Sequence, residues 1–173
     1  MSITNDIKAR VHYHKDNELF FYEALPGTTV VRDLIISAQV KLGITPPFPA
    51  NRTRARHAEF LNTLDNFAGG SIFSVSENPL SKPGNTRMAR TEPIVKHVWD
   101  FRCFDEDQGI RCFGFFGGKN FFIALTWDYR ENIEDFDEAV KECSDEWSRL
   151  FPTIPLFTGS NLDDYLTNYK QLA

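Results

Sequence analysis

The stretch from Val95 to Tyr129 constrains the fold of this chain most strongly, because it holds three apolar, aromatic-rich runs separated by short turns. The runs cover residues 95–104, 110–116 and 121–127, and Asp, Gly and Asn residues occupy the turns between them. Runs of β-branched and aromatic residues bounded by turn residues are typical of strands. The pattern therefore predicts an antiparallel, three-stranded meander.

Two arginines lie in the middle of neighbouring predicted strands. Asp100 and Arg102 share one face of the first strand, and Arg111 shares a face of the second strand with Phe113, because side chains alternate along a strand. Burying an unpaired charge is costly, so a mid-strand arginine needs a reason. Either these arginines reach solvent or pair with a carboxylate such as Asp100, or they form a basic surface that faces phosphate groups.

The composition indicates a single domain, or one domain with a small appendage. The chain has 173 residues, and its 16 phenylalanines favour an aromatic-packed, β-rich interior. No stretch approaches the roughly 20 apolar residues that a membrane helix needs. The first residues lack the charged and apolar pattern of a signal peptide. We therefore expect a cytoplasmic protein that does not contact a membrane.

Charge is unevenly distributed along the chain. The net charge of -5 is the sum of zero for residues 1–50, +2 for residues 51–119 and -7 for residues 120–173. A strongly basic protein would point directly to nucleic acid. Here the middle third alone is expected to present a basic face, and the last third an acidic one.

Residues 1–47 are expected to form an N-terminal extension. Two β-prone runs, Lys8–Tyr13 and Glu18–Ala24, surround a turn and predict a hairpin. A Pro-Gly turn follows, and apolar spacing predicts a helix from about Val30 to Leu42. This hairpin-helix order resembles the opening half of a ubiquitin-like β-grasp unit. The Pro-rich stretch 45–50 then predicts a linker.

A helix and a basic loop precede the meander. Apolar residues at helical spacing over 58–67, ended by a Gly-Gly pair, predict the helix. Residues 70–90 are rich in Ser, Asn, Pro and Gly and carry Lys82, Arg87 and Arg90. Loops of this length are usually functional or disordered. We expect that this one can close over a phosphate backbone beside the two strand arginines.

The acidic last third is expected to be helical. Residues Asp135–Leu150 place an apolar stripe on one side and carboxylates elsewhere, which predicts an amphipathic helix. Residues 152–173 are expected to form a tail that contains a short helix within Asn161–Leu172.

Several of these segments together resemble the RelE/ParE toxin superfamily, and its phage-derived branch in particular. The resemblance rests on the Gly-ended helix, on Leu80, and on the runs Val98–Arg102, Ile110–Phe116 and Phe122–Leu125, and it covers about residues 53–150. It implies an α+β fold in which a small antiparallel sheet of three or four strands packs with helices. The implied RelE-like core covers residues 52–151, between the hairpin-helix extension and the tail.

The resemblance also implies a function. Members of this superfamily cleave RNA, on the ribosome or free, and a partner antitoxin neutralises them. Arg102 and Arg111 match the two strand arginines, and Tyr129 falls where the branch has a terminal basic pair, so these three form the expected catalytic set. His97 is an alternative base. The residues expected to bind RNA are Arg87, Arg90, Lys96, Lys119 and Arg130. No metal or cofactor is implied.

A second hypothesis belongs to a different class. The chain is acidic, and it carries arms outside the RelE-like core, which favours a non-enzymatic phage or mobile-element protein that binds and inhibits a host protein. The acidic helix or the N-terminal extension would then be the docking surface. The two hypotheses differ in whether Arg102, Arg111 and Tyr129 converge on one open surface. The oligomeric state does not follow from the sequence.

Overall fold

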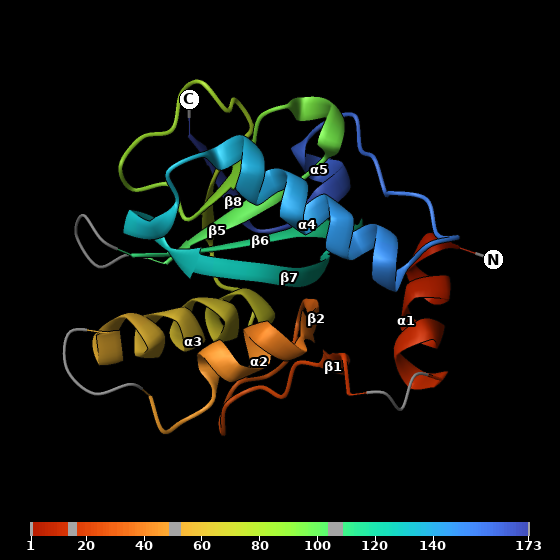
Figure 1. The fold of residues 1–173 in the computed structure, drawn as a ribbon, viewed down its shortest axis with the longest axis horizontal. Coiled ribbons are helices and arrows are strands. Elements are labelled where there is room, and N and C mark those ends of the chain that lie inside the picture. The colour runs from red at the N-terminus through yellow and green to blue at the C-terminus, as the bar shows by residue number, and fades with distance from the viewer. Residues whose placement is uncertain (1, 14–16, 49–52, 104–108, 173) are drawn as a thin grey trace.

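The structure is a computed structural model that describes residues 2–13, 17–48, 53–103 and 109–172. Over these ranges the chain forms one mixed, eight-stranded sheet with helices on both faces (Figure 1). The α+β class is therefore confirmed, but the sheet is twice as wide as the expected three to four strands. Some predicted segments lie outside the described residues: Phe104, most of the turns predicted before Glu18 and before Ile110, and the end of the Pro-rich linker.

The strands run in the order β1-β2-β7-β6-β5-β4-β3-β8 across the sheet. Their bounds are β1 Leu19–Phe21, β2 Asp33–Ser37, β3 Phe73–Ser76, β4 Met88–Arg90, β5 Trp99–Cys103, β6 Ile110–Gly118, β7 Phe121–Tyr129 and β8 Tyr169–Leu172. The α-helices are α1 Ile3–Tyr13, α2 Ala38–Ile44, α3 Arg54–Ala68, α4 Phe136–Leu150 and α5 Leu162–Tyr165.

The predicted meander is present at the centre of the sheet. β5 pairs antiparallel with β6, and β6 with β7. The ladder between β6 and β7 shifts register next to Gly114, where an added Cβ would lie 2.0 Å from the Ile123 carbonyl oxygen. A glycine is therefore required for the two strands to approach this closely.

The N-terminal residues belong to this sheet and do not form a separate extension. β2 pairs in parallel with β7, and β1 pairs antiparallel with β2. The prediction of one helix over Val30–Leu42 is wrong, because Leu34, Ile35 and Ile36 are all buried in a strand. A strand that is apolar on both faces has no alternation that distinguishes it from a helix. The helix begins only after Ser37, whose side chain accepts a hydrogen bond from the Val40 amide.

Three other predicted segments also differ from the structure. Residues 8–13 are the second half of α1, where Ile7 and Val11 pack one turn apart against the sheet, and not a strand. The loop over residues 70–90 contains β3 and β4. The C-terminal residues form the short α5 and then β8, which pairs in parallel with β3 and completes the sheet. The predicted tail is thus an edge of the sheet.

The two long predicted helices are confirmed. α3 ends at Ala68, and the amide of Gly69 donates to the Asp65 carbonyl. α4 begins after Asp135, whose side chain accepts a hydrogen bond from the Asp137 amide. Both have the apolar spacing that the sequence predicts, and α3 begins four residues before the predicted stretch 58–67.

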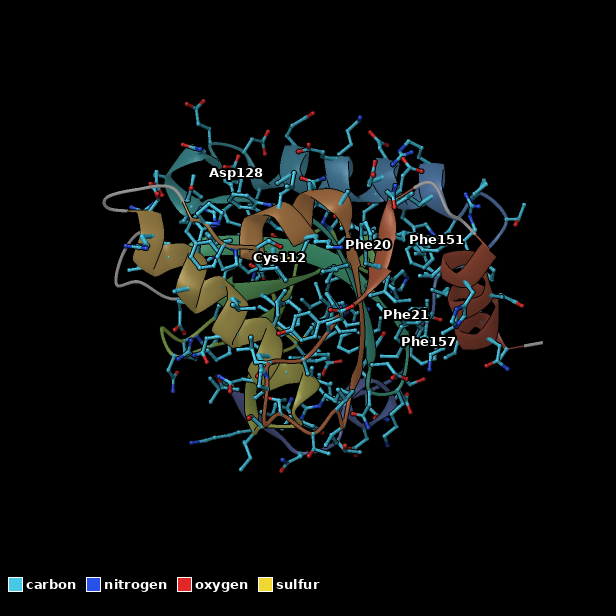
Figure 2. The ribbon with its side chains drawn as sticks, turned by 90° about the horizontal axis from the view of Figure 1, so that it is seen from below. Phe20, Phe21, Cys112, Asp128, Phe151 and Phe157 are labelled. Atoms are coloured by element: carbon cyan, nitrogen blue, oxygen red, sulfur yellow. The ribbon has the colours of Figure 1, made fainter. Side chains whose placement is uncertain are left out.

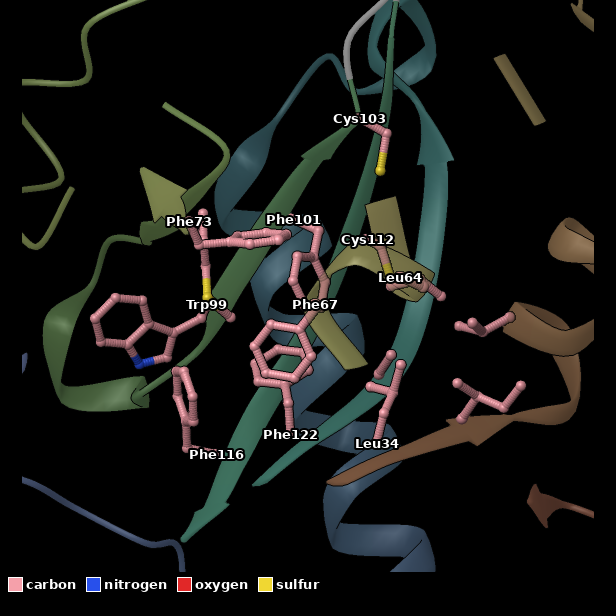
Figure 3. Close-up of a cluster of buried hydrophobic side chains, with 14 of the residues drawn as sticks. Leu34, Leu64, Phe67, Phe73, Trp99, Phe101, Cys103, Cys112, Phe116 and Phe122 are labelled. Carbon is pink, nitrogen blue, oxygen red and sulfur yellow. The ribbon is translucent and has the colours of Figure 1, made fainter. Parts of the chain in front are cut away.

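The helices divide the core into two layers (Figure 1). One layer lies between the sheet and α2 and α3, and Phe67, Phe101 and Phe122 pack there edge to face, with ring centroids 4.9 to 6.1 Å apart (Figure 3). The other lies between the opposite face and α1 and α4, where Phe115 packs on Trp147 with centroids 5.0 Å apart. We call the side of the sheet that α2 and α3 cover the α3 face, and the side that α1 and α4 cover the α4 face.

A buried arginine joins the end of α3 to the segment before β8. Arg32 is 1% exposed and lies against the ring of Phe67. Its guanidinium donates to the carbonyls of Phe67 and Ser71 on one side, and of Thr167 and Asn168 on the other. Burial lowers the pKa of Arg32. These hydrogen bonds fix the segment before β8 against the end of α3.

Candidate functional site

The two strand arginines expected to be catalytic lie directly opposite each other. Arg102 on β5 is the register partner of Arg111 on β6, and both are on the α4 face of the sheet together with Asp100. Arg111 is only 8% exposed, and its Nε lies 3.6 Å from Asp100 Oδ2. Arg102 is partly exposed. Pairing with Asp100 therefore explains how Arg111 is buried, whereas Arg102 still reaches the surface.

Lys82 joins these arginines from the loop between β3 and β4. It is partly buried, and burial lowers its pKa; the positive charges of Arg102 and Arg111 act in the same direction, and Asp100 opposes them. Arg130, which follows β7, is close enough to act on Arg111 in the same way. We call Lys82, Arg102, Arg111 and Arg130 the basic cluster.

Asp100 is the carboxylate around which the basic cluster gathers. It is 1% exposed, and burial raises its pKa, although Lys82, Arg111 and Arg102 oppose the shift. Burial likewise lowers the pKa of Arg111. Both pKa shifts favour the neutral form of the side chain, because a low-dielectric site disfavours charged forms.

The site carries a surplus of positive charge. Besides Asp100, Glu92 is the one further carboxylate that acts on Lys82 among the described residues. Asp128, the register partner of Arg111, is a third carboxylate, so four cations and three carboxylates among the described residues leave a net charge of +1. Asp100 Oδ1 makes no hydrogen bond to any described residue. A surplus of cations around a weakened ion pair is suited to binding an anion.

Tyr129 lies on the opposite face of the sheet. Its hydroxyl is 2.6 Å from His57 Nε2, and His57 Nδ1 is 2.6 Å from the Gly43 carbonyl oxygen. Since the carbonyl only accepts, Nδ1 carries the proton, and the Tyr129 hydroxyl donates to Nε2. The ring of Tyr129 also packs under the Arg56 guanidinium. The expected convergence of Arg102, Arg111 and Tyr129 on one surface does not occur.

The reason for this separation is the alternation along β7. Asp128 is the register partner of Arg111, so it shares the α4 face with the arginine. Tyr129, the next residue, must then point to the α3 face. Unbroken alternation from Phe122 on the α3 face would place Tyr129 on the α4 face, and the register shift between β6 and β7 next to Gly114 reverses this, so the separation of Tyr129 from the basic cluster follows only from the structure.

The remaining residues expected to bind RNA are dispersed. Arg87 pairs with Glu59 of α3 at an N–O distance of 3.1 Å, and Arg90 pairs with Glu77, at the start of the loop after β3, at 3.8 Å. Lys96 is exposed in the 3-10 helix before β5, and Lys119 is exposed beyond the far end of β6. Arg130 is the member of this set that joins the basic cluster.

The expected alternative base lies outside the basic cluster. His97 is near Arg90, with a donor–acceptor distance of 3.4 Å. Burial, and then the charge of Arg90, lowers its pKa. Sequence reasoning placed Lys82 in the basic loop but not among the RNA-binding residues. Lys82 lies two residues after the exposed Leu80, in the loop between β3 and β4. Nothing in the neighbouring sequence indicates that its side chain lies near β5.

The α4 helix limits how much of this face is open. Phe115 packs under Trp147, and Phe113 under Phe136, with ring centroids 5.0 and 6.2 Å apart. The Arg130 guanidinium lies over the Phe136 ring, 4.8 Å from its centroid. The accessible part of the face is therefore the part around the basic cluster, beside the first turn of α4.

Comparisons of this chain with protein-family models, with curated proteins and with solved structures found no match. Within the described ranges, no three His, Cys, Asp or Glu side chains come together in a way that could hold a metal ion. No helix of the described residues is long and apolar enough to cross a membrane.

Proposed function

We propose that the protein binds RNA through phosphate contacts of the basic cluster and does not cleave it. The observation that carries this proposal is that Lys82, in its loop, lies within electrostatic range of Asp100 and of the two strand arginines, which adds a positive charge to the site. Phosphate groups dominate the affinity of nucleic acids for proteins, and arginine forks bind them in a bidentate manner. The RelE-like resemblance is what favours RNA over other anionic ligands.

The loop that carries Lys82 is held in place. The Ser76 hydroxyl donates to the Ser81 carbonyl at 2.6 Å, and the Thr86 amide donates to the Pro83 carbonyl at 2.9 Å. The Asn78 side chain accepts from the Leu80 amide at 2.9 Å. A preorganised loop lowers the entropic cost of presenting Lys82 to a ligand.

Cleavage is unfavourable in this arrangement. Attack of a 2'-hydroxyl needs a base, charge neutralisation at the phosphate and an acid for the leaving oxygen. The basic cluster supplies charge neutralisation. Tyr129 is on the far face, bonded to His57, and Asp100 is 1% exposed. The expected catalytic tyrosine is thus out of reach of a phosphate bound at Arg102, and Asp100 is buried beside Arg111.

The test is binding of a fluorescently labelled single-stranded RNA to wild-type protein, to Lys82→Ala and to Arg102→Ala, between about 50 and 200 mM salt. Each variant is expected to weaken binding by about tenfold and to reduce the salt slope by about 1. The matched control is Lys119→Ala, which removes the same charge at the far end of β6 and is expected to bind like wild type. Equal weakening by Lys119→Ala would refute a localised site, and so would failure of wild type to bind.

Asp100→Asn separates a binding role from a structural one. Removing the carboxylate charge raises the local positive charge by one, so RNA affinity is expected to increase several-fold even as stability falls. If the cluster served stability alone, affinity would not rise. Integrity of the RNA is followed on a denaturing gel in the same samples. RNA cut by wild type and left intact by Tyr129→Phe would show that the binding-only proposal is wrong.

A further inference from the structure

An apolar hollow of about 590 Å³ lies along β1, which is an edge strand of the sheet. Five consecutive residues, 19–23, line the hollow, although consecutive side chains of a strand point to opposite faces of a sheet. The hollow therefore follows the free edge of β1 and not one face of the sheet. Figure 2 looks onto this edge, with α2 on one side of β1 and α1 on the other. Residues of both helices contribute to the lining.

The backbone of β1 presents hydrogen-bonding groups along this edge. Glu18 and Tyr22 form their backbone hydrogen bonds, each of 2.9 Å, on the β2 side of the segment. Hydrogen-bonded and non-hydrogen-bonded pairs alternate in an antiparallel ladder, so the amides and carbonyls of Leu19 and Phe21 point away from β2. Within the described part of the chain, these four groups have no hydrogen-bond partner. Such a row of groups is a template for one more strand.

The lining of the hollow combines apolar side chains with one lysine. The apolar side chains on its α3 face are Phe20, Ile36, Ile44 and Leu61. Lys41 lies beside them, with its Nζ 3.8 Å from the centroid of the Phe20 ring. Lys41 is exposed and forms no ion pair with any residue that the structure describes. Glu23, the one carboxylate among the described lining residues, follows the end of β1. The hollow can thus hold an apolar side chain while Lys41 pairs with a neighbouring carboxylate.

The shape of this edge favours a single extended segment over a second copy of the chain. β1 is three residues long, and α1 and α2 line the hollow on either side of it. A second copy would bring its own α1 and α2 against these helices, whereas a lone segment brings only side chains. Its backbone can pair with Leu19 and Phe21, as an added strand does in peptide recognition.

We propose that the edge of β1 docks an extended segment of a partner protein that carries an apolar and an acidic residue at alternate positions. Residues at alternate positions share one face of a strand and recur roughly 6–7 Å apart. The apolar side chain enters the hollow beside Ile44, and the carboxylate pairs with Lys41, about one helical turn earlier on α2. The site shares no residue with the basic cluster, so it is independent of RNA binding.

The test measures fluorescence anisotropy with a pool of short labelled peptides. Each peptide has Leu and Asp one residue apart, in either order, and Val or Thr elsewhere; a control pool has Lys in place of Asp. Wild type should bind the Asp pool more tightly. Lys41→Ala should weaken this binding by about threefold, as the loss of one exposed ion pair predicts. The matched control, Lys170→Ala, removes an exposed lysine from β8 at the opposite edge of the sheet and should bind like wild type.

Phe21→Pro tests the backbone pairing. Proline removes the amide of Phe21, which takes no part in the ladder with β2, and edge strands tolerate proline at such positions. Phe21→Ala is the matched control, because it removes the same ring and keeps the amide. The proline variant should bind the Asp pool about fivefold more weakly than the alanine variant, which is the effect of one hydrogen bond. Equal binding by the two variants would refute pairing at this amide.

N-methylation of the peptide gives a second readout on the wild-type protein. Each amide of one peptide from the Asp pool is methylated in turn. Only every second amide of an added strand faces its neighbour, so binding should fall at alternate positions. An equal loss at every position, or at none, would refute strand addition.

Four further outcomes would overturn the proposal. Failure of wild type to bind the Asp pool would show that the edge takes no such segment, and equal binding of both pools would refute the pairing with Lys41. Tighter binding of dodecanoate, in competition with the Asp pool, would assign the hollow to a free fatty acid. Dimerisation of wild type in analytical ultracentrifugation that Phe21→Pro abolishes and Phe21→Ala does not would assign the edge to a second copy.

Discussion

Replacement of Asp65 by Asn tests how the segment after β1 is held on the molecule. Asp65 is on α3 and is 7% exposed. Its Oδ1 accepts from the Tyr22 hydroxyl at 2.9 Å and from the Leu25 amide at 2.8 Å, and its Oδ2 accepts from the Thr28 hydroxyl at 2.5 Å. One carboxylate therefore anchors the connection that leads from β1 toward β2.

The expected loss of stability follows from these three hydrogen bonds. A hydrogen bond to a charged group contributes roughly 1.5–3 kcal/mol, about twice as much as a neutral one. Asn retains one carbonyl oxygen for Tyr22 and Leu25, but it presents an amide donor to Thr28. We expect Asp65→Asn to lower the free energy of unfolding by about 2–4 kcal/mol near neutral pH.

The loss should depend on pH in a defined direction. Burial alone would raise the pKa of Asp65, but the hydrogen bonds from Leu25, Thr28 and Tyr22 outweigh it and lower the pKa. A lowered folded-state pKa stabilises the protein above the unfolded value, about 3.9, and this contribution is lost as the pH falls through the folded value. The difference between wild type and variant should therefore be full at neutral pH and shrink below about pH 4.

Urea denaturation followed by tryptophan fluorescence, at about pH 7 and about pH 3, measures both quantities. The control is Asp145→Asn, which breaks the exposed pair with Lys141 and should change stability by less than about 0.5 kcal/mol. A loss for Asp65→Asn that is the same at both pH values would refute the linkage argument. A loss below about 1 kcal/mol at neutral pH would refute the hydrogen-bond accounting.

Three further outcomes follow from the packing of the core. Arg32→Lys keeps the charge but loses the planar fork that serves four carbonyls, so urea denaturation should show a loss of about 2–4 kcal/mol. Gly114→Ala should lower the free energy of unfolding, measured by thermal melting, by about 3 kcal/mol or more, because the added Cβ would lie 2.0 Å from the Ile123 carbonyl oxygen. The control Gly84→Ala, with nothing within 4 Å of the added Cβ, should be close to neutral. Burial raises the pKa of the Cys103 thiol to about 12, so this thiol should resist a disulfide reagent at about pH 8 until the protein is unfolded in urea.

Part of the candidate site was predictable from local pattern. Strand alternation places Asp100 and Arg102 on one face of β5 and Arg111 in the middle of the neighbouring strand, and the register that sets Arg102 opposite Arg111 comes from the structure. The face of Tyr129 was not predictable in this way, because the register shift between β6 and β7 next to Gly114 brings Asp128, and not Tyr129, to the face of Arg111. The resemblance to a toxin family grouped Tyr129 with the arginines, whereas strand geometry separates them.

The sequence by itself determined the central meander, α3 and α4, because hydrophobic periodicity and capping residues act over a few neighbouring positions. Only the tertiary structure decided that Leu34–Ile36 form a strand, that β8 pairs with β3, and that Lys82 reaches Asp100. The physical reason is that a strand buried on both faces has no alternation. Edge pairing and loop placement, in turn, depend on partners that are distant in the chain.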